Sequence, residues 1–188
     1  FRWAQDENIL NGNPASKIKE PKLDVRVPKF LSEVEMEHLR EACHTTLENA
    51  LFEFMYSTGC RIGEAVNLNR QSINFSNQSV VVLGKGNKER EVYFNTRCDI
   101  WLKRYLEERT DDQEALFVTV RAPHRMSISQ MRYVIKKISK RSGINKSIHP
   151  HQLRHSYATL NNGAPLEVIQ NLMGHEKSET TKIYAYLS

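Results

Sequence analysis

One short β-hairpin pattern stands in a chain whose other patterns are helical, and this mixture limits the possible folds. The Val-rich segment Ser79–Leu83 and the alternating segment Glu89–Phe94 flank two glycines, Gly84 and Gly86. Two such segments around glycines predict antiparallel strands joined by a turn. Elsewhere apolar residues recur at helical spacing. We therefore expect a mainly α fold with a small antiparallel sheet near residues 72–94, and residues 116–119 as a candidate further strand.

Capping residues and glycines mark the ends of the predicted helices. Ser32 and Glu35 form a capping-box pattern, and Gly59 ends a helix expected at about 46–58. Arg61 opens a short third helix. Apolar spacing predicts further helices near 96–109, 127–142, 151–161 and 179–186, and Pro165 fits the first turn of another.

Composition divides the chain into three parts. Residues 1–12 are typical of the end of a helix, 13–29 contain the Asn-Pro, Glu-Pro and Val-Pro breaks of a linker, and 30–188 hold the amphipathic patterns. The chain has 188 residues, 39% of them hydrophobic, which is enough for one compact domain. No apolar run approaches the ~20 residues that span a bilayer. Three scattered cysteines indicate reduced thiols in a cytoplasmic protein.

Positive charge is concentrated in one stretch of the sequence. Residues 115–166 contain nine basic and no acidic residues, whereas the rest of the chain holds the other 18 basic and all 22 acidic residues. This separation indicates a polyanionic partner, because neutralising phosphates releases counterions. A merely solvated helix face is the alternative for any basic helix taken alone. The block includes Arg132, Lys136, Lys137, Lys140 and Arg141 of one predicted helix.

Two arginines stand where fixed positive charge could meet an anion. Arg61, in Thr-Gly-Cys-Arg-Ile-Gly-Glu, begins a helix, and Glu64 follows three residues later, close enough to orient its guanidinium. Arg154, in His-x-x-Arg-His, shares a helix face with His151 and lies next to His155. Arginine donates two parallel hydrogen bonds and stays protonated, so it suits the charge that develops on a reacting phosphate.

Three further motifs supply other reactive side chains. Lys85 lies between two glycines at the expected hairpin tip, with Lys88 close by. His175 ends Leu-Met-Gly-His, and Tyr184 ends Thr-Thr-Lys-Ile-Tyr. Taken singly, each residue has an ordinary structural explanation: a turn lysine, a helix-end histidine, a core tyrosine.

Together, these five motifs and their order resemble the tyrosine recombinases, the family of phage integrases and Xer-type recombinases. The resemblance implies DNA strand cleavage and rejoining through a covalent 3′-phosphotyrosine, without ATP, metal or other cofactor. It implies that Glu64 and His155 support the catalytic residues and that the basic block and Lys88 bind DNA. The implied catalytic residues are Arg61, Lys85, His151, Arg154, His175 and Tyr184.

The resemblance also implies partners and a domain arrangement. Residues 1–12 would end the last helix of an N-terminal DNA-clamping domain, and 30–188 would be the catalytic domain. The full-length protein would act as a tetramer on two double-stranded DNA sites, associated with the nucleoid and not with a membrane. Family members usually continue after the tyrosine into a tail that docks on a neighbouring protomer. Between Arg154 and His175 the chain is about two residues shorter than the family pattern, which would rotate later residues by roughly 200° within a helix.

Four alternatives remain open from the sequence. A type IB topoisomerase-like enzyme would share the chemistry without strand exchange, and a non-catalytic DNA-binding module would keep the fold alone. His149, His151 and His155 could instead hold the metal of a nuclease, although the cluster lacks the Glu of HExxH. Tyr186 is a rival for the nucleophile.

Overall fold

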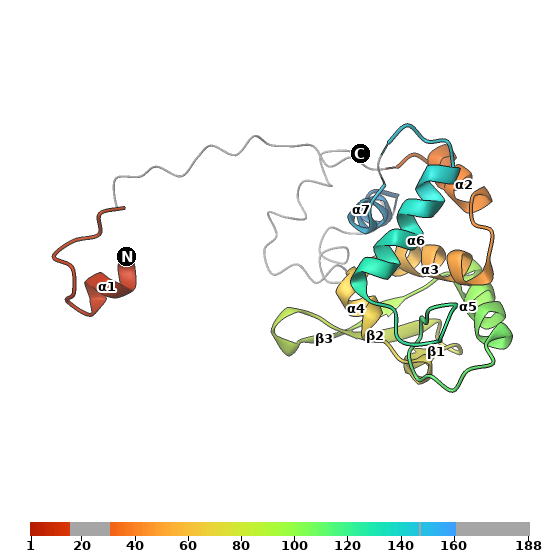
Figure 1. Ribbon diagram of the computed structural model, residues 1–188, viewed down its shortest axis with the longest axis horizontal. Helices are drawn as coiled ribbons and strands as arrows, with labels where there is room; N and C mark the ends of the chain where they lie inside the picture. Colours follow the sequence, from red (N-terminus) through yellow and green to blue (C-terminus); the bar gives the residue numbers. More distant parts are fainter. Residues whose placement is uncertain (16–30, 147, 161–188) are drawn as a thin grey trace.

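The computed structural model describes residues 1–15, 31–146 and 148–160, and of Lys85, His155 and 157–160 it describes the backbone alone. The predicted helices beyond residue 160 therefore lie outside the described residues. Figure 1 shows the arrangement. The helices are α1 (Arg2–Asp6), α2 (Glu33–Glu41), α3 (Thr46–Thr58), α4 (Ile62–Val66), α5 (Thr96–Glu108), α6 (Ile128–Arg141) and α7 (Pro150–Leu160), with short 3-10 helices η1 (Arg70–Ser72) and η2 (Lys85–Asn87).

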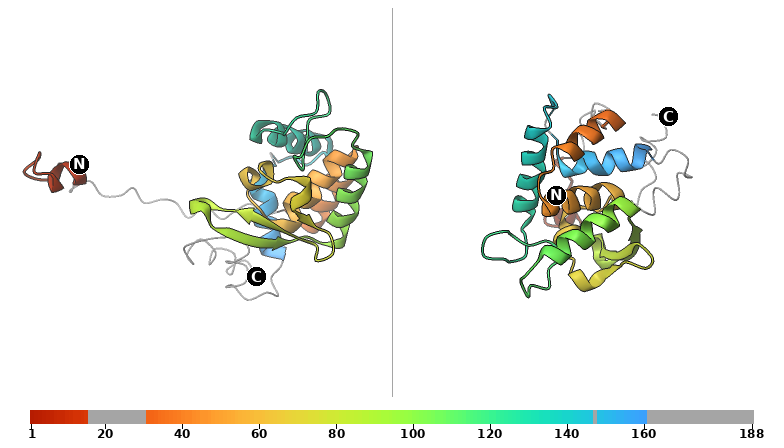
Figure 2. Two further views of the ribbon diagram at one scale, coloured as in Figure 1. Left: turned by 90° about the horizontal axis from the view of Figure 1, so that it is seen from below. Right: turned by 90° about the vertical axis from the view of Figure 1, so that its right-hand side faces the viewer.

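Three strands form one antiparallel sheet in the order β1 (Ile73–Asn74), β2 (Ser79–Leu83) and β3 (Glu89–Tyr93). The register pairs Ser79 with Tyr93 and Leu83 with Glu89, so the predicted antiparallel hairpin is present. Val80, Val82 and Val92 are buried, so one face of the sheet joins the core. The β2–β3 hairpin extends beyond the helices (Figure 2).

Helix α3 lies at the centre of the fold and packs against α5, α6, α7 and strand β3. Helices α2, α6 and α7 lie on one side of it, and α5 and the sheet lie on the other (Figure 1). Ten of its 13 residues are buried, including Leu51, Phe52 and Phe54. The described helices are too short or too polar to cross a membrane.

Local signals fix the helix ends as predicted. The Ser32 hydroxyl accepts from the Glu35 amide, and the Glu35 carboxylate accepts from the Ser32 amide, so the capping box before α2 is present. Gly59 ends α3 with φ 56°, a left-handed conformation that favours glycine. The three cysteines, Cys43, Cys60 and Cys98, are free.

The predicted strand at 116–119 does not form, because side chains occupy the hydrogen-bonding groups that a ladder would need. Arg109 donates to the carbonyls of Ala115 (2.6 Å) and Leu116 (3.1 Å). The Val118 amide donates to the Tyr105 hydroxyl at 3.1 Å. Only isolated bridges remain in this part of the described chain, at Ala115 and Val118.

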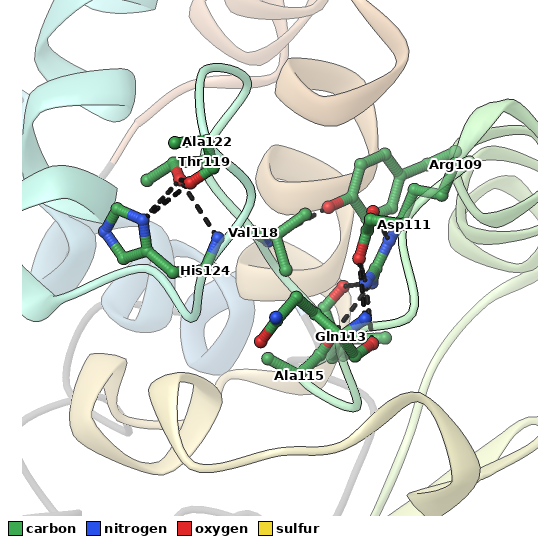
Figure 3. Close-up of polar contacts among 10 residues, drawn as sticks. Arg109, Asp111, Gln113, Ala115, Val118, Thr119, Ala122 and His124 are labelled. Carbon is green, nitrogen blue, oxygen red and sulfur yellow. Dashed lines mark hydrogen bonds and ion pairs between the residues drawn. The ribbon is translucent and has the colours of Figure 1, made fainter.

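Side-chain contacts also brace the connection between α5 and α6, where regular structure is lacking (Figure 3). The Arg109 guanidinium, 4% exposed, pairs with Asp111 through Nη2 at 2.6 Å and Nε at 2.9 Å. His124 contacts the Thr119 hydroxyl and the Ala122 carbonyl through Nδ1. This brace fixes the path along which the chain reaches α6.

Replacing Arg109 by Ala should lower the free energy of unfolding by about 3 kcal/mol, because Asp111 and the carbonyls would lose a buried cationic donor. Urea denaturation measures the change. Arg104→Ala removes an exposed arginine of α5, five residues before Arg109, and we expect a change within about 0.5 kcal/mol. Similar losses in both variants would contradict the role given to Arg109.

Candidate active site

The Glu64 carboxylate joins the first candidate arginine to the sheet. Its Oε1 accepts from Arg61 Nη1 at 3.0 Å, and its Oε2 accepts from the Arg61 amide at 2.7 Å. The predicted contact between these two residues is therefore present. Arg61 caps α4 with extended backbone, while its side chain remains 35% exposed. The guanidinium is thus held at one edge and reaches the surface.

Sequence reasoning missed Arg90, which forms a fork on the same carboxylate. Its Nη1 donates to Glu64 Oε1 at 2.9 Å, and its Nη2 donates to Oε2 at 2.8 Å. Burial alone would raise the pKa of Glu64, but hydrogen bonds from Arg90 and from the Arg61 amide outweigh it and lower the pKa. Glu64 is therefore ionised near neutral pH. The alternation of charged and apolar residues in β3 gave no sign of this partner 26 positions away.

Arg154, in α7, lies beside this cluster and is only 4% exposed. Its Nη1 donates to the carbonyl of Gly59, the residue that ends α3, 95 positions away in the sequence. The pKa of Arg154 is lowered to about 10, chiefly by burial and then by the positive charge of Arg61, against the opposing effect of Glu64. Folding thus brings the two predicted arginines close enough for mutual repulsion.

His151 lies one helical turn before Arg154, at the start of α7. Pro150 occupies the first position of α7, and the Gln152 side chain accepts from the His149 amide at 2.9 Å. His151 reaches the surface, yet partial burial lowers its pKa, followed by the charges of Arg154, Arg132 and Arg61. The imidazole is therefore neutral near pH 7 and can accept a proton.

The turn of the β2–β3 hairpin begins at Gly84, which packs against Arg90 and Glu64 and directly precedes Lys85. Lys85 begins η2, which contains Gly86 at φ 74° and Asn87 at φ 61°. The Gly84 amide donates to the Lys88 carbonyl at 2.8 Å and closes the turn. Lys88 is exposed beside it.

The basic residues of α6 divide into two groups. Arg141 and Lys137 form ion pairs with Glu48 of α3 at 2.5 and 3.6 Å, so both help to join α6 to α3. The other group is exposed along one face at four-residue spacing, and within the described residues no hydrogen bond or ion pair engages it. Its members are Arg132, Lys136 and Lys140.

This chain is similar in sequence and in structure to known proteins. Residues 29–188 match the phage integrase family. The whole chain is 36% identical, over 203 aligned residues, to tyrosine recombinase XerC of Oceanobacillus iheyensis and covers 66% of it. It is 37% identical over 204 residues to tyrosine recombinase XerD of Ralstonia nicotianae, covering 65% of that protein. The crystal structure of XerA recombinase has a TM-score of 0.79 at 34% identity, over 90% of this chain and 63% of that one.

The chain belongs to the phage integrase family. The resemblance to tyrosine recombinases drawn from its motifs is confirmed, and so is the predicted fold class. This integrase-family chain spans about two thirds of the length of the XerC and XerD relatives.

Several predicted positions of this integrase-family chain lie outside the described residues. His175 and Tyr184 are among them, and so is most of the shortened segment before His175. The side chains of Lys85 and His155 are likewise not described. Among the residues that are described, no group of three His, Cys, Asp or Glu side chains could hold a metal ion.

Replacing Arg132 by Gln should raise the pKa of His151 towards its ordinary value of 6.5, because one positive neighbour that disfavours the imidazolium is removed. An NMR titration of the imidazole resonances measures the shift. Lys140→Gln removes a charge two turns along the same helix and should leave the titration unchanged. An equal rise in both variants would mean that net charge, and not the neighbour, sets this pKa.

Proposed function

We propose that this chain is the catalytic domain of a site-specific DNA recombinase that cleaves and rejoins strands through a covalent 3′-phosphotyrosine. Membership of the phage integrase family supports the reaction class. The observation that carries the proposal is the meeting of Arg61 and buried Arg154, which come from distant segments: Arg154 bonds the carbonyl of Gly59, two residues before Arg61, and the positive charge of Arg61 helps to lower the pKa of Arg154. Two neighbouring guanidinium groups suit a phosphodiester, because its anionic oxygens attract both cations and offset the repulsion between them.

In this proposal Tyr184 is the nucleophile. Its oxygen attacks the phosphorus, the bond to the 5′-oxygen breaks, and the 3′ side of the strand stays on the tyrosine. Neutral His151 accepts the tyrosine proton, and Lys85 gives a proton to the departing 5′-oxygen. Arg61, Arg154 and His175 stabilise charge on the non-bridging oxygens. Attack by a 5′-hydroxyl reverses the step, so rejoining needs no ATP.

The exposed face of α6 provides the surface for duplex DNA in this proposal. Arg132 is near enough to His151 to affect its pKa, so this face adjoins the candidate active site. Lys136 and Lys140 continue it along the helix and would contact backbone phosphates, as would Lys88 of the hairpin. Lys137 and Arg141 contribute less, because Glu48 already neutralises part of their charge. In the full-length protein, four copies would act on two sites in the cytoplasm, at the nucleoid.

Replacing Tyr184 by Phe should abolish the covalent protein–DNA adduct while leaving DNA affinity almost unchanged, because only the attacking hydroxyl is lost. The test uses a duplex nicked close to the scissile phosphate, so that the cleaved strand diffuses away and the adduct accumulates on a denaturing gel.

Tyr186→Phe is the matched control and should still form the adduct. Loss of the adduct in that variant instead would move the nucleophile by two positions. DNA binding without any adduct from the unaltered protein would support a non-catalytic DNA-binding module.

Replacing Lys136 and Lys140 together by Ala should weaken binding to all duplexes and flatten its salt dependence. Each lost phosphate contact lowers the magnitude of the log–log slope by about 0.9. Fluorescence anisotropy across a salt series measures that slope. The double variant of Lys137 and Lys146, which pair with Glu48 and Glu35, removes the same charge and should change the slope less. A slope unchanged from that of the unaltered protein would show that this face of α6 is merely solvated.

A further inference from the structure

The Glu64 carboxylate has its hydrogen-bonding capacity filled by two arginines from different elements. Each oxygen accepts once from Arg61 and once from Arg90, at distances from 2.7 to 3.0 Å. Arg61 begins α4, whereas Arg90 lies in β3. One carboxylate therefore links the helix that carries a candidate catalytic arginine to the hairpin that carries Lys85.

Burial distinguishes the roles of the two arginines. The Glu64 side chain is 5% exposed and that of Arg90 is 13% exposed, whereas that of Arg61 is 35% exposed. Arg61 thus reaches outward from the carboxylate, and Arg90 lies on its more buried side. A substrate phosphate would meet Arg61 more readily than Arg90. This placement suits Arg90 for holding other residues rather than for contacting DNA.

The base of the hairpin turn packs against the same pair. A Cβ atom added to Gly84 would lie 3.3 Å from Arg90 Nη1, 3.3 Å from the Lys88 carbonyl oxygen and 3.7 Å from Glu64 Oε1. Glycine therefore allows the strand to approach the ion pair closely. Since Lys85 directly follows Gly84, the Arg90–Glu64 ion pair helps to position the backbone of Lys85.

We propose that Arg90 is a positioning residue that fixes the Lys85 hairpin to Glu64 and so to Arg61. This inference rests on the proposed function, in which Lys85 protonates the leaving 5′-oxygen. Arginine is required because its planar fork engages both carboxylate oxygens at once, whereas an ammonium acts as a single point charge. A displacement of about 1 Å at a catalytic group is enough to slow a reaction roughly 10²-fold.

The first test compares two nicked duplexes, one with the natural 5′-oxygen at the scissile phosphate and one with sulfur in that bridging position. A thiolate leaves without being protonated, since thiols are far stronger acids than alcohols. Arg90→Lys should slow single-turnover cleavage of the oxygen substrate about 10²-fold with little change in DNA affinity. On the sulfur substrate, the deficit should shrink by about tenfold or more. Lys85→Ala should show the same pattern, and Arg61→Gln should remain slow on both substrates.

Arg109→Lys is the matched control, because Arg109 also makes a fork on a carboxylate but lies in the α5–α6 connection. It should cleave both substrates at the unaltered rate. A deficit in Arg90→Lys that is equal on oxygen and sulfur would overturn the proposal. So would full activity of Arg90→Lys on both substrates.

The second test follows the hairpin itself, without reference to chemistry. Amide hydrogen exchange in the turn 84–88 should become faster in Arg90→Lys and, more mildly, in Gly84→Ala, while exchange in α3 stays the same. Unchanged exchange in the turn would overturn the role of Arg90. If Lys85→Ala instead cleaves normally, the proposed function of Lys85 fails, and the exchange measurement still decides whether Arg90 holds the hairpin.

Discussion

Burial of α3 on nearly all sides is the constraint on which the rest of the structure depends. A central helix must bury polar side chains as well as apolar ones, and buried carboxylates are tolerated when they are paired. Glu53 of α3 pairs with Arg40 of α2, and Glu48 of α3 pairs with Arg141 of α6. These two ion pairs join α2 and α6 to α3 beside the apolar residues that both helices bury. The basic residues Arg132, Lys136 and Lys140 of α6 lie on its exposed face.

The candidate active site depends on the same helix. The carbonyl of Gly59, the residue directly after α3, accepts a hydrogen bond from Arg154. Arg61 begins α4 only two residues later. The end of α3 therefore sets the position of Arg61 and binds the side chain of Arg154. Burying Arg154 beside Arg61 opposes folding, as its lowered pKa indicates, but it leaves positive charge ready for an anion. The same closeness of Arg61 and Arg154 that opposes folding thus supplies the positive charge that the proposed reaction needs.

Some expectations from the sequence were accurate because they depend on a few neighbouring residues. Glycine at 59 adopts the left-handed conformation that stops α3, and the capping box at Ser32 starts α2. The predicted hairpin also forms, with β2 and β3 paired antiparallel around the turn that contains Gly84 and Gly86. By contrast, the predicted strand at 116–119 failed because the side chains of Arg109 and Tyr105, which lie outside this segment, take some of the backbone groups that a ladder would need.

By itself, the sequence determined the family, the fold class, most helix and strand ends, and the pairing of Glu64 with Arg61, since each depends on motifs or on short-range spacing. Only the tertiary structure decided that Arg90 completes the Glu64 site, that Arg154 reaches Gly59, and that Arg141 faces α3 instead of solvent. Long cationic side chains have many rotamers and can meet any acidic group that folding brings within reach. Their partners are therefore fixed by the packing of distant elements, which no local pattern in the chain records.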